Sequence, residues 1–218
     1  MIPRKDAKIL REKLKKIKIF LFDFDGVFTN GEQGIGFNER DVMGINMLRL
    51  GYYLVSKRLP IICITTGEKN DSIVKLVKRE HFEYLFLGIK DKKLTLNFFE
   101  KKISIKPSQI AVVYDDVNDL SVVEKVDLKI LVNQSGTPIF KELMKRQKKY
   151  DYLTYEKGGE GAVREICELI LGLLGIYSDC IKHRQNYSKI YKKYWAIRND
   201  LTSLCYLQRA NRLQKLII

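Results

Sequence analysis

One stretch near the start of the chain limits the fold most strongly. Residues 17–22 form an almost unbroken apolar run rich in Ile and Phe, and two aspartates, Asp23 and Asp25, follow it. Such a run is typical of a strand buried on both faces at the centre of a parallel sheet. Because side chains alternate along a strand, the two carboxylates point to one side where that strand ends. Aspartate there also commonly starts a turn or caps a helix, and this stretch alone leaves both interpretations open.

The rest of the chain alternates between buried apolar strands and helical patterns. This alternation predicts an α/β fold with a doubly wound parallel sheet and right-handed crossovers. The gaps between strands leave no room for an inserted second domain, so the core over residues 1–174 is expected to be capless. A short flap is expected at 30–38. The predicted strands are 61–64, 84–87, 110–114, 128–132 and an edge strand at 151–154, and the predicted helices are 4–16, 42–57, 70–79, 93–102, 137–147 and 161–174.

Residues 175–218 differ in character and are treated as a basic amphipathic helical extension. From Tyr187 to Cys205, apolar residues recur on one face at 3.6-residue spacing, which predicts one helix of about two dozen residues. The apolar face could pack on its own domain or on a neighbouring subunit. Alternatively, it could dock another partner, or the basic face could meet an acidic one.

Charge and cysteine content set broader limits. The net charge is +14, but Lys and Arg are spread along the whole chain, which favours a solvated surface over a membrane or nucleic-acid surface. The four cysteines are scattered without a C-x-x-C pair, as expected for reduced thiols in a cytoplasmic protein. No cleavable signal sequence is evident, and the longest apolar segment, 169–177, is too short to span a membrane.

Further polar groups follow the other predicted strands. Thr66 and Gly67 follow one, Lys92 lies in the loop after the next, and Asp115 follows the strand at 110–114, with Asp116 and Asp119 close behind. Carboxyl ends of parallel strands meet at one edge, where α/β proteins bind ligands. Each residue alone has an ordinary explanation as a helix cap or a solvated charge. In this order they indicate one site.

These groups resemble the four motifs of the haloacid dehalogenase superfamily of phosphotransferases. Within it, the chain is most similar to the capless 3-deoxy-manno-octulosonate 8-phosphate phosphatase family, and also to the phosphatase-like domain of some acylneuraminate cytidylyltransferases. The resemblance covers about residues 12–174. The matching segments are Asp23-Phe24-Asp25-Gly26, Thr66-Gly67, Gly88 to Lys92, Asp115-Asp116 with Asp119, residues 37–45, and residues 158–165.

The resemblance implies a Mg²⁺-dependent phosphatase acting on a small sugar-acid phosphate. Asp23 would attack phosphorus, Asp25 would act as general acid and base, and Thr66 and Lys92 would hold the phosphoryl oxygens. Side-chain oxygens of Asp23 and Asp115 and the backbone carbonyl of Asp25 would bind Mg²⁺, which prefers oxygen ligands. Asp116 and Asp119 would orient Lys92 and metal-bound water. Substrate-binding residues would be Asn38, Arg40, Asp41 and Gly67.

Because no cap covers the site, we expect a homo-oligomer, with the tetramer of the resembled family favoured. The chain departs from the family pattern in having Glu68 in place of the usual arginine, Val42 in place of a glycine, a shorter flap, and Tyr114, which would place bulk near the metal loop. A catalytically weak binding or scaffolding subunit, acting through its basic C-terminal helix, is the alternative function. Nucleic-acid binding is disfavoured because the extension's tyrosines fall on the apolar face.

Overall fold

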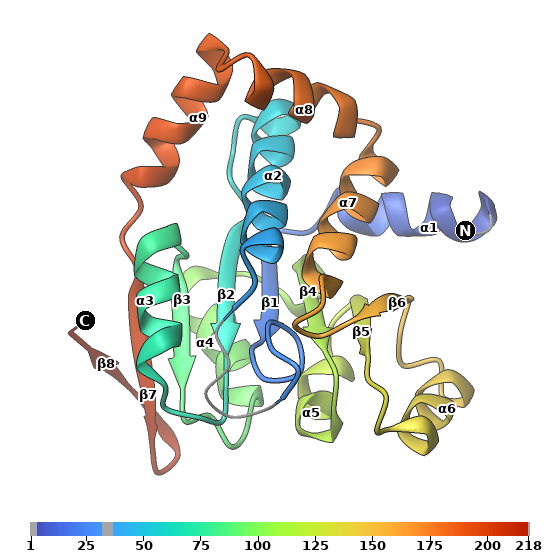
Figure 1. The fold of residues 1–218 in the computed structure, drawn as a ribbon. Coiled ribbons are helices and arrows are strands. Elements are labelled where there is room, and N and C mark those ends of the chain that lie inside the picture. The colour runs from blue at the N-terminus through green and yellow to red at the C-terminus, as the bar shows by residue number, and fades with distance from the viewer. Residues whose placement is uncertain (1–3, 32–36, 218) are drawn as a thin grey trace.

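The computed structural model describes residues 4–31 and 37–217, and it contains one eight-stranded sheet between layers of helices (Figure 1). The strand order is β6-β5-β4-β1-β2-β3-β7-β8, and every pairing is parallel except that of β7 with β8. The strands are β1 (Ile19–Asp23), β2 (Ile61–Thr65), β3 (Tyr84–Leu87), β4 (Ile110–Tyr114), β5 (Leu128–Asn133), β6 (Tyr152–Lys157), β7 (Leu204–Arg209) and β8 (Arg212–Leu216).

Helices cover both faces of this sheet. Helices α1, α2, α3 and α7 contribute to the core on one face, and α4, α5 and α6 to the core on the other. The helices are α1 (Arg4–Leu14), α2 (Glu39–Ser56), α3 (Asp71–Glu80), α4 (Lys93–Ile103), α5 (Leu120–Val123), α6 (Pro138–Arg146), α7 (Ala162–Leu174), α8 (Tyr177–Gln185) and α9 (Lys189–Asn199), with 3-10 turns at η1 (Pro107–Gln109) and η2 (Val117–Asp119).

Strand β1 is the central strand that the apolar run predicts. All five of its residues are buried. Phe20 and Phe22 pack into one core, while Ile19 and Leu21 pack into the other, as the alternation of side chains along a strand requires. β1 pairs with β2 on one side and β4 on the other, so the chain changes winding direction there. The predicted α/β doubly wound fold is confirmed.

The described connections contain no inserted cap domain. One helix, α2, fills the described part of the connection from β1 to β2, and α4 with η1 fills that from β3 to β4. Residues 32–36 of the predicted flap lie outside the described residues, and so do 1–3 and 218. No helix among the described residues is long and apolar enough to cross a bilayer.

The extension, residues 175–218, is not the single long helix that the periodicity predicts, and that prediction is wrong in its last part. Helix α9 ends at Asn199, and residues 204–209 form β7, which pairs in parallel with the otherwise open edge of β3. Its pairing satisfies backbone groups of β3 that an edge strand would leave without partners. Cys205 and Leu207 point into the core with a spacing of two residues, as in a strand. The helical interpretation had counted Cys205 as part of a 3.6-residue pattern.

The two helices of the extension pack on α2, as one of the two alternatives for this segment required. Tyr191 and Tyr194 form a small buried cluster with Met47, Leu50 and Tyr53 of α2. The Tyr194 hydroxyl donates a hydrogen bond to the carbonyl oxygen of Asn46 at 2.8 Å. The boundary after residue 174 stays a prediction, but the extension completes the sheet and one flank of the core.

Replacing Tyr194 with alanine tests this packing. The side chain is 1% exposed, so Tyr194→Ala should lower the free energy of unfolding by about 3 kcal/mol or more. The exposed neighbour Lys193 provides the control, because Lys193→Ala should change it by no more than about 0.5 kcal/mol. Urea unfolding curves measure both, and equal midpoints for the two variants would contradict the described packing.

Candidate active site

A cleft of about 500 Å³ opens where the four central strands end, and its lining contains most of the predicted catalytic residues. We call it the carboxyl-end cleft. Asp23 and Asp25 reach it from β1, and Asp115 and Asp116 from β4. Its lining residues are Asp23, Asp25, Gly26, Gly31, Gly67, Glu68, Ile89, Lys90, Lys92, Asp115, Asp116 and Asn118. Side chains far apart in sequence therefore converge as the strand-end argument predicts.

Lys92 lies at the base of this cleft between two carboxylates. Its ammonium is 2.7 Å from Asp23 Oδ1 and 2.6 Å from Asp119 Oδ1, and its side chain is only 3% exposed. Burial alone would lower the pKa of Lys92, but the two carboxylates raise it overall above its usual value. Lys92 therefore stays cationic and holds Asp23 in one position.

Three carboxylates form a group that could hold a metal ion. One oxygen each from Asp23, Asp115 and Asp119 lies within 4.8 Å of the others. Asp115 Oδ1 and Asp119 Oδ2 are buried and make no hydrogen bond within the described residues. Buried oxygens without a donor are costly, and a divalent cation would satisfy them. The donor set therefore fits a hard cation such as Mg²⁺.

The acidity of this group reflects the same crowding. Burial, and then the charge of Asp23, raise the pKa of Asp115 to about 8. Burial also raises the pKa of Asp119 and of Asp23, although Lys92 opposes the rise at both. Without a cation, the cluster therefore retains protons near neutral pH, which a metal ion would displace.

Asp119 lies closer to the centre of the site than a residue that only orients Lys92 and metal-bound water would need to. It contacts Lys92 and also belongs to the three-carboxylate group, whereas that group does not include the carboxylate of Asp25. Asp116 lines the cleft, but its Oδ1 accepts the backbone N–H of Val117 and caps η2. The roles assigned to these residues stay predictions.

Thr66 is fully buried and contacts Asp25. Its hydroxyl donates to Asp25 Oδ2 at 2.9 Å and accepts the N–H of Glu68 at 3.0 Å. Thr66 is not among the residues that line the cleft, whereas Asp25 and Gly67 are. In this structure Thr66 therefore fixes the carboxyl of Asp25, and its predicted contact with phosphate stays a prediction.

Gly26 is required by a close approach that sequence reasoning did not find. Its φ of +79° is in the left-handed region, and a Cβ there would lie 1.9 Å from Asp115 Oδ2. The loop after β6 also closes on this turn, since a Cβ at Gly158 would lie 2.0 Å from the Gly26 carbonyl oxygen. Gln134 donates to the same oxygen. Gly158 and Gln134 therefore support the site, although only the glycine lies in a matched motif.

The predicted substrate-binding residues Asn38, Arg40 and Asp41 do not line the carboxyl-end cleft in a single chain. Asn38 caps α2 through its Oδ1 and donates from Nδ2 to the Gly159 carbonyl oxygen. Asp41 is completely buried, and its Oδ1 accepts the N–H of Arg164 in the first turn of α7. Asn38 and one carboxylate oxygen of Asp41 thus hold the start of α2 to the loop before α7 and to its first turn, while Asp41 Oδ2 makes no hydrogen bond among the described residues. Their substrate-binding role stays a prediction.

Two departures from the family pattern have different consequences in the structure. Glu68 is exposed and lines the cleft, as does Lys90, so the charge of Glu68 would act on an incoming substrate. Tyr114 is expected to place bulk near the metal loop, and this stays a prediction. Its ring is buried in the core beneath α4–α6, and its hydroxyl donates to the Lys149 carbonyl oxygen at 2.9 Å.

Known proteins match this chain in sequence and in fold. The 3-deoxy-D-manno-octulosonate 8-phosphate phosphatase KdsC of Salmonella typhi is 30% identical over 167 residues, which are 73% of this chain and 81% of the relative. The chain belongs to this phosphatase family of the haloacid dehalogenase superfamily. No family model matches the sequence.

Solved structures of KdsC-family and related proteins agree. The Moraxella catarrhalis 3-deoxy-D-manno-octulosonate 8-phosphate phosphatase, in complex with magnesium, phosphate and KDO, superposes with a TM-score of 0.68 at 28% identity. The match covers 82% of this chain and 99% of that one. A haloacid dehalogenase superfamily (subfamily III A) hydrolase from Legionella pneumophila gives 0.69 at 25% identity, covering 84% and 97%. The predicted family, fold class and enzyme class, a phosphoric monoester hydrolase, are confirmed.

The raised pKa values in the three-carboxylate group predict how the stability of the metal-free protein depends on pH. Folding raises the pKa of Asp115 from 3.8 to about 8, so the folded state binds a proton that the unfolded state releases between those values. The free energy of unfolding without metal should therefore fall as pH rises from about 5 to about 8, by at least about 1 kcal/mol. Chemical unfolding at several pH values measures this slope.

The matched control for this prediction is Asp115→Asn, which removes the titrating carboxyl but keeps its shape. Its slope should be shallower over the same pH range, and added MgCl₂ should stabilise the parent chain more at the higher pH than at the lower. An unchanged slope in Asp115→Asn would show that this carboxyl does not titrate as described.

Alanine variants of two glycines with similar backbone angles can distinguish conformational strain from steric crowding at the metal loop. Gly26 and Gly31 have φ of +79° and +85°, so alanine at either costs about 1 kcal/mol. Among the described residues, no heavy atom lies within 4 Å of a Cβ at Gly31, whereas a Cβ at Gly26 would displace Asp115. Gly26→Ala should therefore lower the unfolding free energy by about 2 kcal/mol more than Gly31→Ala in denaturant titrations. Similar losses would refute the close approach.

Proposed function

We propose that this chain is a Mg²⁺-dependent phosphatase that hydrolyses a small sugar-acid phosphate, similar to 3-deoxy-octulosonate or nonulosonate phosphates, through an aspartyl-phosphate. The observation that carries the proposal is the position of Asp23, fixed by buried Lys92 in a cleft that also contains Asp25 and Asp115. A fixed carboxylate beside a second, hydrogen-bonded carboxyl provides a nucleophile and a proton donor in one site.

The residues support two balanced steps. In the first, a carboxylate oxygen of Asp23 bonds to phosphorus, the ester P–O bond breaks, and Asp25 gives its proton to the leaving sugar oxygen. In the second, Asp25 takes a proton from water as the water oxygen bonds to phosphorus. The bond from phosphorus to Asp23 then breaks and inorganic phosphate leaves.

Neighbouring residues position and stabilise the groups that take part in these steps. Thr66 holds the Asp25 carboxyl by the hydrogen bond from its hydroxyl, so the proton is delivered from one position. Lys92 offers positive charge beside Asp23, where the phosphoryl oxygens would gather. Asp23, Asp115 and Asp119, with the Asp25 carbonyl as predicted, would hold Mg²⁺. When bound, this ion neutralises negative charge between the carboxylates and the phosphoryl group.

The exposed carboxylate of Glu68 affects which substrate charge the site can accept. It lies at the mouth of the cleft, where a carboxylate on the substrate would be repelled unless Lys90 or a bound cation offsets it. A phosphatase screen should therefore include neutral sugar phosphates beside sugar-acid phosphates. Absence of phosphate release from all of them would favour the alternative of a catalytically weak binding subunit.

Substitution of the nucleophile tests the covalent mechanism. Asp23→Asn should reduce Mg²⁺-dependent phosphate release by at least about a thousandfold, because the amide cannot form the aspartyl-phosphate. EDTA should abolish release by the parent chain. Asp71→Asn is the matched control, because Asp71 is an exposed carboxylate on α3 outside the cleft, and it should retain parental rates. Equal rates for Asp23→Asn and the parent would exclude Asp23 as the nucleophile.

We also propose that the protein is a cytoplasmic homo-oligomer, with a tetramer favoured. No cap covers the cleft within the described residues, so a neighbouring copy would cover a small substrate there. Light scattering during size-exclusion chromatography should give a mass of four chains at micromolar concentration. A mass of one chain at every concentration tested would contradict the proposal.

A further inference from the structure

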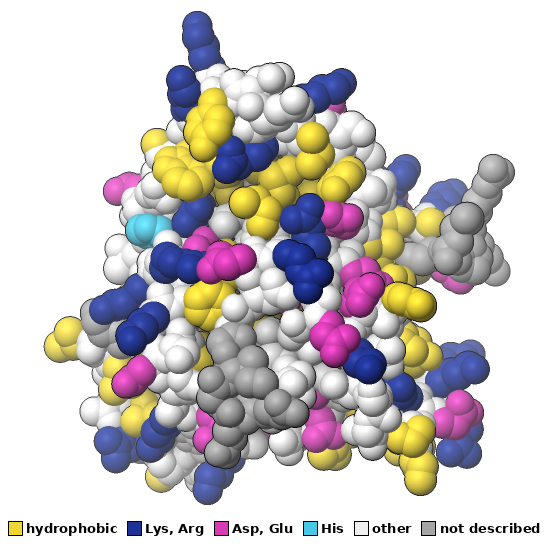
Figure 2. All heavy atoms as spheres, viewed as in Figure 1, with side chains coloured by type: hydrophobic (Ala, Val, Ile, Leu, Met, Phe, Trp, Pro, Cys, Tyr) yellow, Lys and Arg dark blue, Asp and Glu magenta, His cyan; other side chains and the backbone are white. Residues whose placement is uncertain are grey.

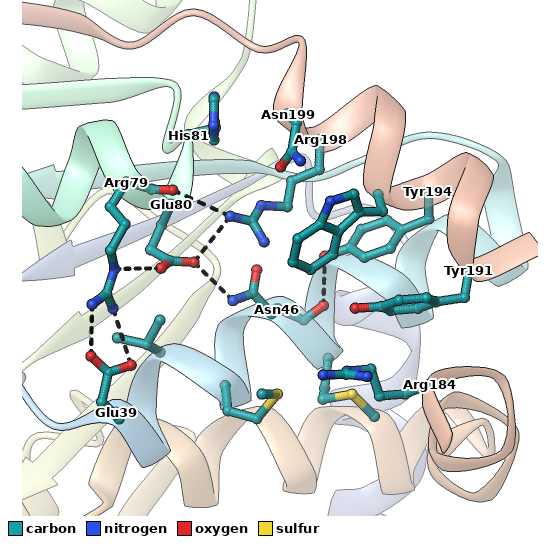
Figure 3. A pocket seen from close by; sticks show the side chains of 14 residues that line it. Glu39, Asn46, Arg79, Glu80, His81, Arg184, Tyr191, Tyr194, Arg198 and Asn199 are labelled. Carbon is teal, nitrogen blue, oxygen red and sulfur yellow. Dashed lines mark hydrogen bonds and ion pairs between the residues drawn. The ribbon is translucent and has the colours of Figure 1, made fainter. Parts of the chain in front are cut away.

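A second cavity, of about 400 Å³, lies on the flank of α2, and none of the described residues lines both it and the carboxyl-end cleft. It is formed by α2, the end of α3, and helices α8 and α9 of the extension (Figure 3). We call it the extension cavity. Its volume is within the range of about 300–1,000 Å³ that small-molecule sites occupy.

One side of the extension cavity is apolar and aromatic. Met43 and Met47 of α2 line the cavity, as do Tyr191 and Trp195 of α9. The ring centroids of Tyr191 and Trp195 are 5.9 Å apart, and Trp195 is 43% exposed. Figure 2 shows hydrophobic side chains gathered over this part of the molecule, with Lys and Arg among them. This wall suits a flat, apolar ring.

The other side is polar, and its charges are largely paired. Glu80 accepts hydrogen bonds from Arg79, Arg198 and Asn46 at 2.8–3.2 Å (Figure 3). Arg79 also binds both carboxylate oxygens of Glu39, at 2.7 and 3.1 Å. Glu80 and Arg198 are 6% and 5% exposed, so this pair forms a buried end of the cavity, whereas the side chains of Arg79 and Glu39 are exposed.

Arg184 is the exception to this pairing. Its guanidinium carbon lies 4.8 Å from the Tyr187 ring centroid and 5.2 Å from that of Tyr191. Among the described residues, no carboxylate lies within ion-pair distance of it. The two rings hold the guanidinium at the aromatic side and leave its N–H groups for another acceptor.

The charges in the lining indicate how much negative charge a ligand would bring. The lining contains three arginines, Arg79, Arg184 and Arg198, and two glutamates, Glu39 and Glu80, which leaves one positive charge. A single carboxylate would balance it. A phosphate monoester, with about two negative charges, would leave an excess beside the glutamates.

We propose that the extension cavity binds an aromatic monocarboxylate. The ring would lie against Tyr191 and Trp195, with Met43 and Met47 also in the lining, and the carboxylate would accept hydrogen bonds from Arg184. A planar guanidinium matches a carboxylate with two parallel hydrogen bonds. The site is separate from the carboxyl-end cleft, so it does not depend on the proposed phosphatase activity.

The single tryptophan of the chain, Trp195, provides a direct readout. Phenylacetate added to the full chain should change the Trp195 fluorescence with a dissociation constant on the order of 1 mM, as expected for about ten heavy atoms. Acetate lacks the ring and benzyl alcohol lacks the charge, so each should bind at least about tenfold more weakly. Equal responses to phenylacetate and benzyl alcohol, or none to phenylacetate, would overturn the proposal.

Variants of Arg184 and Lys192 distinguish a specific contact with the carboxylate from general electrostatic attraction by the basic surface. Arg184→Gln should weaken phenylacetate binding about tenfold, while Arg184→Lys, which keeps the charge, should weaken it less. Lys192→Gln removes an exposed charge from α9 outside the cavity lining and should leave binding unchanged. Circular dichroism checks that each variant is folded. Unchanged affinity in folded Arg184→Gln, or equal losses in it and Lys192→Gln, would refute the role of Arg184.

Discussion

The ion pairs of Lys92 are the interaction on which the candidate site depends. Asp23, Asp115 and Asp119 lie within a few ångströms of one another, and such crowding of buried carboxylates is unfavourable without positive charge. The Lys92 ammonium, between Asp23 and Asp119, supplies that charge from inside the protein. Asp115 Oδ1 and Asp119 Oδ2 make no hydrogen bond among the described residues, and a metal ion there would complete the balance.

The sheet brings these groups together because its winding direction changes at β1. Strands β2 and β3 lie on one side of β1, and β4 lies on the other, so loops from both halves meet at one edge. Close backbone contacts then set the positions within that edge. The turn at Gly26 meets Asp115 and the loop at Gly158, and Asp41 fixes the first turn of α7.

The extension adds both strands and helices to the molecule. Strand β7 lengthens the sheet beyond β3, and α8 and α9 arch over α2 (Figure 1). Their tyrosines cover part of α2 and leave a cavity in which an arginine has no carboxylate partner among the described residues. The solved relative from Moraxella catarrhalis is matched over 99% of its length but only 82% of this chain, so this chain has parts without a counterpart there.

The sequence by itself determined the elements whose signals are local. A continuous apolar run predicted β1, and polar residues at strand ends predicted where Asp23, Asp25, Lys92 and Asp115 converge, because parallel strands end at one edge. Only the tertiary structure decided what depends on distant partners. Residues 204–209 form a strand because their backbone hydrogen bonds are made with the edge of β3. Asp41 is buried where its carboxylate accepts a backbone N–H from the first turn of α7. Periodicity describes one segment at a time, and it contains no information about which neighbour that segment will meet.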